Sequence, residues 1–192
     1  MRSMTDAVAR SLSILGHPVV VVPGAVALLL LHRRASSPLL IVLALSLIAG
    51  AVLIFSVWQV HRGRWQHVDA SLVQERRSLN LFLAIVLFLA AAIAFVASAE
   101  PGLTLGLALS GLLIVLVILA SPWVKLSLHA SFAAFAVVLL WPLPFWFVAI
   151  AALAAASICW SRVLLARHTV IEVVAGSLLG AIIGACFWIA VW

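Results

Sequence analysis

The stretch of sequence that says most about this protein is SRVLLARHTVIEVVAG, which occupies residues 161–176. It places two arginines, a histidine and a glutamate between apolar runs, in a chain of which only 8% of the residues are charged. Ionisable groups at the edge of a membrane segment, or inside one, are costly unless they are paired, so they mark functional sites by default. We therefore expect this stretch to join two membrane helices and to carry chemistry.

Within this stretch, His168 and Glu172 are four positions apart, which on a helix puts them on one face within hydrogen-bond reach. A carboxylate that takes the proton of one imidazole nitrogen fixes the tautomer and leaves the other nitrogen as a nucleophile. Arg162 and Arg167 can supply the guanidinium forks that suit phosphate. The pattern predicts a nucleophilic histidine beside bound phosphate. The alternative is a basic loop followed by a capping histidine and a glutamate that reaches the membrane surface.

The spacing Ser161-Arg162, five residues, His168, three residues and an acid resembles the third motif of the type 2 phosphatidic acid phosphatase (PAP2) superfamily. That family usually has Asp where this chain has Glu172. Ser127 and His129 similarly resemble the family's second motif, Pro-Ser-Gly-His, although leucines replace its Pro and Gly. A lone histidine near a helix start is more often a capping or packed residue, so His129 gains its weight from its position upstream of the third motif.

The family's first motif, Lys, six residues and Arg-Pro, is matched only in part. Arg76 is the candidate phosphate ligand and Arg77 the second, but Asp69 stands where Lys is expected and Arg77 where Pro is expected. Lys125 or Arg167 would then replace the missing Lys. The alternative for most charges of this loop is an amphipathic segment lying on lipid headgroups. The resemblance covers residues 69–180, which would form a PAP2-like catalytic core.

The resemblance implies a metal-independent lipid phosphatase that needs no cofactor. His168 would attack phosphorus and form a phosphohistidine, Glu172 would orient His168, and His129 would protonate the leaving oxygen and then activate water. The phosphate ligands would come from Ser127, Ser161, Arg76, Arg77, Lys125, Arg162 and Arg167. Independently of the resemblance, the acidic residues are too scattered in sequence for the several carboxylates that hard divalent ions prefer.

Composition places the chain in a membrane. Hydrophobic residues make up 67% of the 192 residues, and the mean hydropathy is +1.36, far above soluble domains. The net charge of +6 comes from residues clustered at segment ends, so we expect no nucleic-acid partner. Cys159 and Cys186 lack metal-ligand spacing and are interpreted as packing residues. The sequence therefore predicts a single all-α, polytopic transmembrane domain over residues 1–192.

Apolar runs of about 20 residues are needed to span a membrane as helix. Residues 127–160 would form one helix about 51 Å long, too long for a core of about 30 Å, and Pro142 and Pro144 divide them. We therefore expect a tight hairpin of two short arms, and a bundle of six or seven spans. The first span resembles a signal sequence but would remain uncleaved, because it ends in His32-Arg33-Arg34 rather than at the small residues of a cleavage site. The expected spans are 12–31, 38–60, 79–98, 103–120, 127–141, 145–160 and 170–191.

Seven spans put the polar clusters on one face, where the helices starting at Ser127 and near Thr169 would aim their positive ends at a bound anion. Nine of the eleven Lys and Arg residues lie on that face. Once the possible phosphate ligands are set aside, five basic residues remain on that face and two on the opposite face. The positive-inside rule then favours a cytoplasmic site in a bacterial-type plasma membrane.

Two other functions remain open. One is a non-catalytic phospholipid binder or transporter that keeps the phosphate site, since the first two motifs are altered; phosphate release separates it from an enzyme. The other is an electron carrier in which His129 and His168 ligate a haem, which a visible spectrum would reveal. The identity of the phosphorylated lipid substrate is left open among phosphatidate, phosphatidylglycerophosphate and polyprenyl phosphates or diphosphates.

Overall fold

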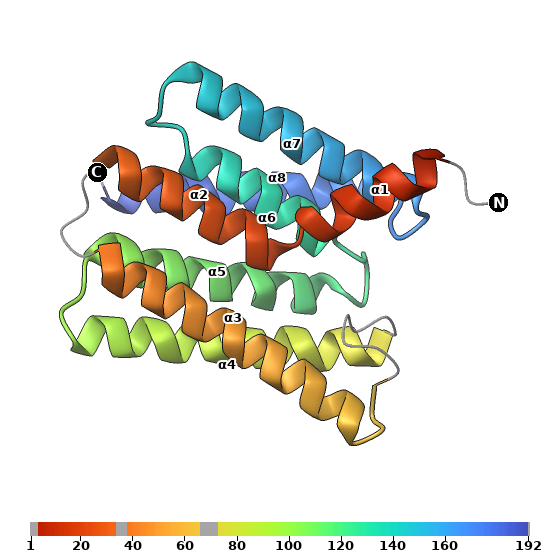
Figure 1. Ribbon diagram of the computed structural model, residues 1–192, viewed down its shortest axis with the longest axis horizontal. Coiled ribbons are helices and arrows are strands. Elements are labelled where there is room, and N and C mark those ends of the chain that lie inside the picture. The colour runs from red at the N-terminus through yellow and green to blue at the C-terminus, as the bar shows by residue number, and fades with distance from the viewer. Residues whose placement is uncertain (1–3, 34–37, 66–72, 192) are drawn as a thin grey trace. The chain divides into compact units, whose positions relative to one another are not determined.

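A computed structural model describes residues 4–33, 38–65 and 73–191 of the chain. These residues form eight helices and no strand (Figure 1), so the all-α prediction is confirmed for the described part. The helices are α1 (Met4–Leu15), α2 (Pro18–Arg33), α3 (Pro38–His61), α4 (Val73–Val96), α5 (Pro101–Ala120), α6 (Leu128–Leu139), α7 (Phe145–Leu164) and α8 (Val170–Val191).

Five helices within the described residues are long and apolar enough to cross a membrane, as expected of a multi-pass membrane protein. They are the segments Ile41–His61, Gln74–Val96, Pro101–Ala120, Phe145–Leu164 and Val170–Val191. Two shorter apolar segments, Val20–Leu29 and Leu128–Leu139, fall below that length. The predicted count of six or seven spans is therefore not matched exactly.

The first expected span, residues 12–31, is not one helix. Pro18 has no backbone N–H to continue α1 and suits the first position of a new helix, so α1 ends at Leu15 and α2 begins at Pro18. Pro23 does remain inside α2.

The hairpin expected from Pro142 and Pro144 is present. α6 and α7 pack against each other on either side of a turn at residues 140–144. The second arm is longer than expected. α7 continues to Leu164 and contains Ser161 and Arg162, two residues that we expect from the sequence to lie in a loop.

The described helices group into two compact units. Unit 2, residues 36–119, contains α3, α4 and α5. Phe55 of α3 stacks on Phe82 of α4 with ring centroids 4.0 Å apart, and Gly111 of α5 leaves room for the Phe88 ring of α4. Unit 1, residues 1–35 and 120–192, contains α1, α2, α6, α7 and α8. The candidate site residues Ser127, His129, Arg162, His168 and Glu172 all belong to this unit.

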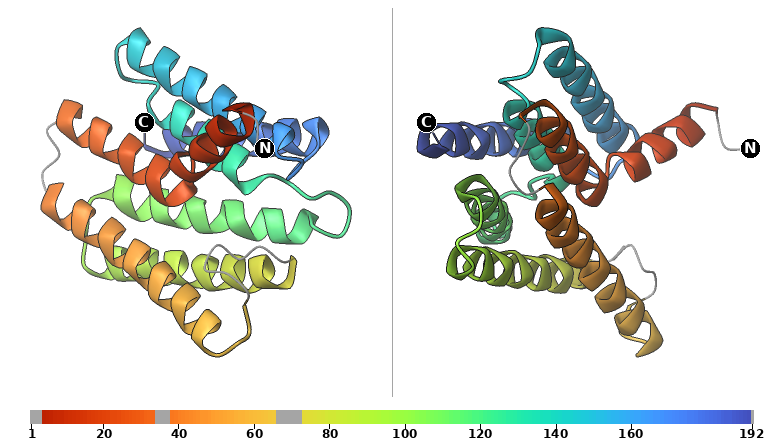
Figure 2. Two further views of the ribbon diagram at one scale, coloured as in Figure 1. Left: turned by 45° about the vertical axis from the view of Figure 1, so that its right-hand side comes forward. Right: turned by 60° about the vertical axis from the view of Figure 1, so that its left-hand side comes forward.

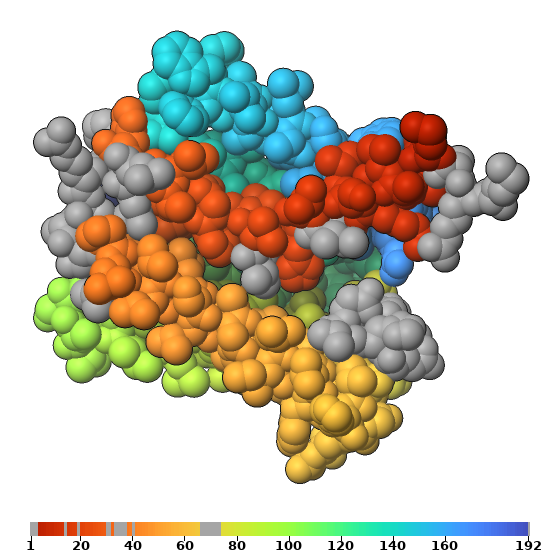
Figure 3. All heavy atoms as spheres, viewed as in Figure 1, coloured from red at the N-terminus to blue at the C-terminus, as the bar shows by residue number. Residues whose placement is uncertain are grey.

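In unit 1, α6 is the central helix, in contact with α2, α7 and α8, while α1 runs along α7 (Figures 1 and 2). In the space-filling view, α1 and α2 form a strip across this face of unit 1 and hide most of α6 (Figure 3). This packing makes α6 the helix most enclosed by other protein, with Ser131, Phe135 and Ala136 among its buried residues.

α6 and α8 approach closely because α8 presents glycines along one face, at positions 176, 180 and 184. An added Cβ at Gly180 would lie 1.9 Å from the Ser131 carbonyl oxygen, and one at Gly184 would lie 2.7 Å from Val138 Cβ. Small residues at this spacing let helix backbones meet inside membranes. Contacts advance together along both helices, so α6 and α8 run parallel and begin side by side.

Candidate active site

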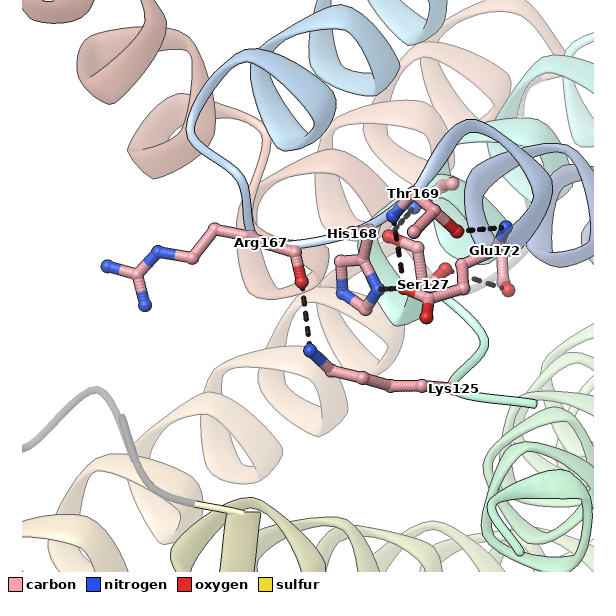
Figure 4. Close-up of polar contacts among 8 residues, drawn as sticks. Lys125, Ser127, Arg167, His168, Thr169 and Glu172 are labelled. Atoms are coloured by element: carbon pink, nitrogen blue, oxygen red, sulfur yellow. Dashed lines mark hydrogen bonds and ion pairs between the residues drawn. The ribbon is translucent and has the colours of Figure 1, made fainter. Parts of the chain in front are cut away.

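The N-terminus of α8 is closed by a capping box. Thr169 Oγ1 accepts a hydrogen bond from the Glu172 backbone N–H at 3.3 Å, and Glu172 Oε2 accepts one from the Thr169 N–H at 3.2 Å, which satisfies two amides that a helix start leaves without partners. The same Oε2 atom lies 2.9 Å from Nδ1 of His168 (Figure 4). The cap therefore fixes Glu172, and Glu172 in turn holds the imidazole.

The contact between His168 and Glu172 was predicted, but its structural origin was not. His168 precedes α8 instead of lying on its surface. Its side chain is 8% exposed and that of Glu172 is 20% exposed. The cap of α8 and the contact with the imidazole are thus made by one carboxylate, whereas the alternative considered from the sequence gave the capping role to His168.

The C-terminus of α7 sets the position of His168. Ala166 adopts φ +50°, its N–H donates to the Val163 carbonyl at 3.0 Å, and the Arg167 N–H donates to the Arg162 carbonyl at 3.0 Å. This is a Schellman motif with alanine at the left-handed position that usually holds glycine. The His168 N–H donates to the same Arg162 carbonyl at 3.2 Å, so the chain turns sharply from α7 into α8.

Ser127 begins α6 directly beside the start of α8. Its Oγ accepts a long bond from the Ala130 N–H at 3.5 Å, its carbonyl accepts from Ser131 Oγ at 3.0 Å, and its N–H donates to the Glu172 carbonyl at 3.3 Å. Gly176 allows Ser127 to approach α8 this closely, because an added Cβ there would lie 2.8 Å from the Ser127 carbonyl oxygen. The expected convergence of the two helix N-termini is confirmed.

Arg162 brings together the remaining groups of the site. It donates from a terminal guanidinium nitrogen to Ser13 Oγ of α1 at 2.6 Å, and it acts electrostatically on His17, His129 and His168. The rings of His17 and His129 meet edge to face, with centroids 5.2 Å apart and planes at 89°. Among the described residues, no three His, Cys, Asp or Glu side chains are placed to hold a metal ion.

Ser13 and His17 were missed in the sequence. Ser13 lies in the last turn of α1 and His17 in the break between α1 and α2. Both are far along the chain from the three motifs, and no spacing rule links them to His129 or Arg162. The only local signal was a histidine between Gly16 and Pro18, two residues that interrupt helices.

The predicted phosphate ligands differ in position. Lys125 Nζ donates to the Arg167 carbonyl at 2.9 Å, which draws the α5–α6 connection to the loop before α8, whereas the guanidinium of Arg167 points away from His168 and Glu172 (Figure 4). Ser161 is fully buried and donates to the Ile158 carbonyl at 2.7 Å within α7. Arg76 and Arg77 lie near the start of α4, which belongs to unit 2. Asp69 lies outside the described residues.

Burial lowers the pKa of His168 below the usual value for histidine, and the positive charges of Arg162 and Lys125 act in the same direction. The hydrogen bond and negative charge of Glu172 oppose them and raise the pKa. A lowered pKa keeps the imidazole neutral, and therefore able to act as a nucleophile, at more acidic pH.

No protein-family model matches the chain, and comparisons with curated proteins and with solved structures gave no significant match.

Proposed function

We propose that this protein is an integral-membrane lipid phosphate phosphatase of the PAP2 type, which hydrolyses a phosphomonoester or diphosphate headgroup. The observation that carries the proposal is the 2.9 Å contact between His168 Nδ1 and Glu172 Oε2, made where α6 and α8 both begin. A histidine held through one nitrogen by a carboxylate is the arrangement of an activated nucleophile.

The charges around His168 suit a phosphate. The positive charges of Arg162 and Lys125 both act to lower the pKa of His168. The N-termini of α6 and α8 place the positive ends of two helix dipoles beside it. A guanidinium can bind two phosphoryl oxygens at once, while an ammonium acts as a point charge. We assign Arg162 as the main phosphate ligand and Lys125 as the second cation.

In the proposed reaction, Nε2 of His168 forms a bond to phosphorus as the bond from phosphorus to the leaving oxygen breaks. His129 donates a proton to that oxygen, so that an alcohol, or a phosphate from a diphosphate, departs. His129 then takes a proton from water, whose oxygen attacks the phosphohistidine. The bond between phosphorus and Nε2 breaks, inorganic phosphate leaves, and both histidines are regenerated. Glu172 holds the Nδ1–H throughout.

The substrate would keep its phosphate at the membrane surface and its tails among the apolar helices. The distribution of basic residues favours a site that faces the cytoplasm of a bacterial-type plasma membrane. Phosphatidate, phosphatidylglycerophosphate and polyprenyl phosphates or diphosphates all carry the required group.

The deciding experiment measures phosphate release by the purified protein in detergent–lipid micelles from each of these lipids, with His168→Ala as the control. We expect release from at least one lipid and none above background in the control. With an aryl phosphate, whose leaving group needs little protonation, His129→Ala should accumulate an acid-labile phosphate on the peptide that contains His168. Label on another peptide, or turnover by His168→Ala, would overturn the nucleophile assignment. Tight binding of these lipids without release would instead identify a lipid-binding protein.

A further inference from the structure

The break between α1 and α2, residues 16–17, is held against the site from two directions. Gly16 packs on α7 so closely that an added Cβ would lie 2.4 Å from Ile158 Cγ1. One turn earlier, Ser13 Oγ accepts the 2.6 Å hydrogen bond from Arg162. The break is also ordered internally, because the Gly16 N–H donates to the Leu12 carbonyl and the Val20 N–H to the His17 carbonyl, both at 2.8 Å. These contacts fix the backbone of His17 independently of its side chain.

That backbone position places the His17 ring edge to face with the His129 ring. His129 is the second residue of α6, and a side chain in a first helical turn has no preceding turn to limit its rotamers. An aromatic ring packed at right angles restricts the torsions that turn the imidazole. The distance between centroids, 5.2 Å, lies within the range in which such pairs have a preferred geometry.

We propose that His17 is a positioning residue for His129, and that its ring holds the His129 imidazole in the orientation needed for proton transfer. This inference rests on the proposed phosphatase function, and it adds a residue from the break between α1 and α2 to those that serve the proposed reaction. His17 acts through the shape of its ring. It is assigned no contact with substrate and no proton of its own to deliver.

The kinetic test compares His17→Ala, His17→Phe and the control His32→Ala, an exposed histidine at the far end of α2. Loss of orientation should lower kcat of His17→Ala about 10- to 100-fold and leave KM unchanged, because the phosphate ligands are intact. His17→Phe keeps a flat ring and should retain most of the wild-type kcat, and His32→Ala should match the wild type. A fall in kcat as large for His17→Phe as for His17→Ala would overturn the positioning role.

A second measurement reads the ring contact directly. In protein with isotope-labelled histidine, the ring-proton chemical shifts of His129 should change in His17→Ala, because the neighbouring ring current is lost, and should stay closer to wild type in His17→Phe. Unchanged His129 shifts in both variants would refute the contact. An active wild type whose kcat is unaffected by His17→Ala would overturn this inference alone. An inactive wild type would overturn the proposed function, and the role of His17 with it.

Discussion

At the scale of single residues, Glu172 serves the fold and the proposed chemistry through one oxygen atom. Oε2 accepts from the Thr169 N–H and lies against His168 Nδ1. Glutamine also serves at this position of a capping box, so Glu172→Gln should keep the start of α8 while removing the negative charge. A purely structural Glu172 would therefore be replaced by glutamine without loss of activity. A carboxylate that orients and supports a nucleophile could not be replaced by glutamine without a loss of activity.

We predict that Glu172→Gln lowers turnover about 10²- to 10⁴-fold, by analogy with orienting carboxylates in other enzymes, and that it moves the acid limb of the pH–rate profile to lower pH. The sign follows because Glu172 raises the pKa of His168, so its removal lets the imidazole stay neutral in more acidic solution. Measuring kcat/KM against pH for the wild type and for Glu172→Gln locates the acid limb of each profile. An acid limb that stays in place, or full activity of the variant, would remove Glu172 from the mechanism.

Much of this residue-scale picture could be predicted, because it is local. Spacing along the chain brought His168 and Glu172 together, and the turn between helices was visible as a polar interruption of apolar sequence. The role of His17 could not be predicted. Its proximity to His129 depends on how α2 packs on α6, and a single sequence carries no rule for the partner of an isolated histidine.

At the scale of helices, the distance between α6 and α8 determines whether Ser127 and His129 reach the start of α8. Gly180 sets that distance, since an added Cβ would lie 1.9 Å from a backbone oxygen of Ser131. A backbone atom cannot turn aside as a side chain can, so the two helices must separate. The prolines that divide the hairpin were read correctly from the sequence. The glycines of α8 were not interpreted, because their spacing gains meaning only once α6 is known to be the neighbour.

We predict that Gly180→Ala destabilises the protein by about 1–3 kcal/mol, the usual cost of overpacking, and lowers phosphatase activity as well. Gly50→Ala is the matched control, because Gly50 lies inside α3 and an added Cβ there meets nothing within 4 Å. It should be neutral or slightly stabilising, since alanine favours helix over glycine by about 1 kcal/mol. Thermal unfolding of the solubilised proteins measures both. Equal unfolding midpoints for the two variants would show that α6 and α8 are not in close contact.

At the scale of the whole molecule, length and composition predicted a helical membrane protein, and the five long apolar helices agree. The length rule failed for the first expected span, which is divided between α1 and α2, whereas α6 is short, as expected of a hairpin arm. A membrane helix that faces lipid must supply its own backbone hydrogen bonds across the full core, whereas a helix enclosed by protein can end early and leave its flanks to neighbours. α6, enclosed by α2, α7 and α8, is of this second kind, and composition alone could not distinguish the two.

The last prediction is that α6 crosses the membrane although its 12 residues span only about 18 Å. Trp123 before α6 and Trp141 after it are 85% and 74% exposed.

In a background without Cys159 and Cys186, single cysteines at these two positions should react with a membrane-impermeant reagent from opposite sides of intact membranes. A cysteine at Val191 should react from the same side as the one at Trp141, because α8 runs parallel to α6. Reaction of the Trp123 and Trp141 positions from the same side would make α6 a re-entrant segment. The side on which Trp123 reacts also identifies the membrane face of the site, since the connection that follows Trp123 leads directly to Lys125 and Ser127.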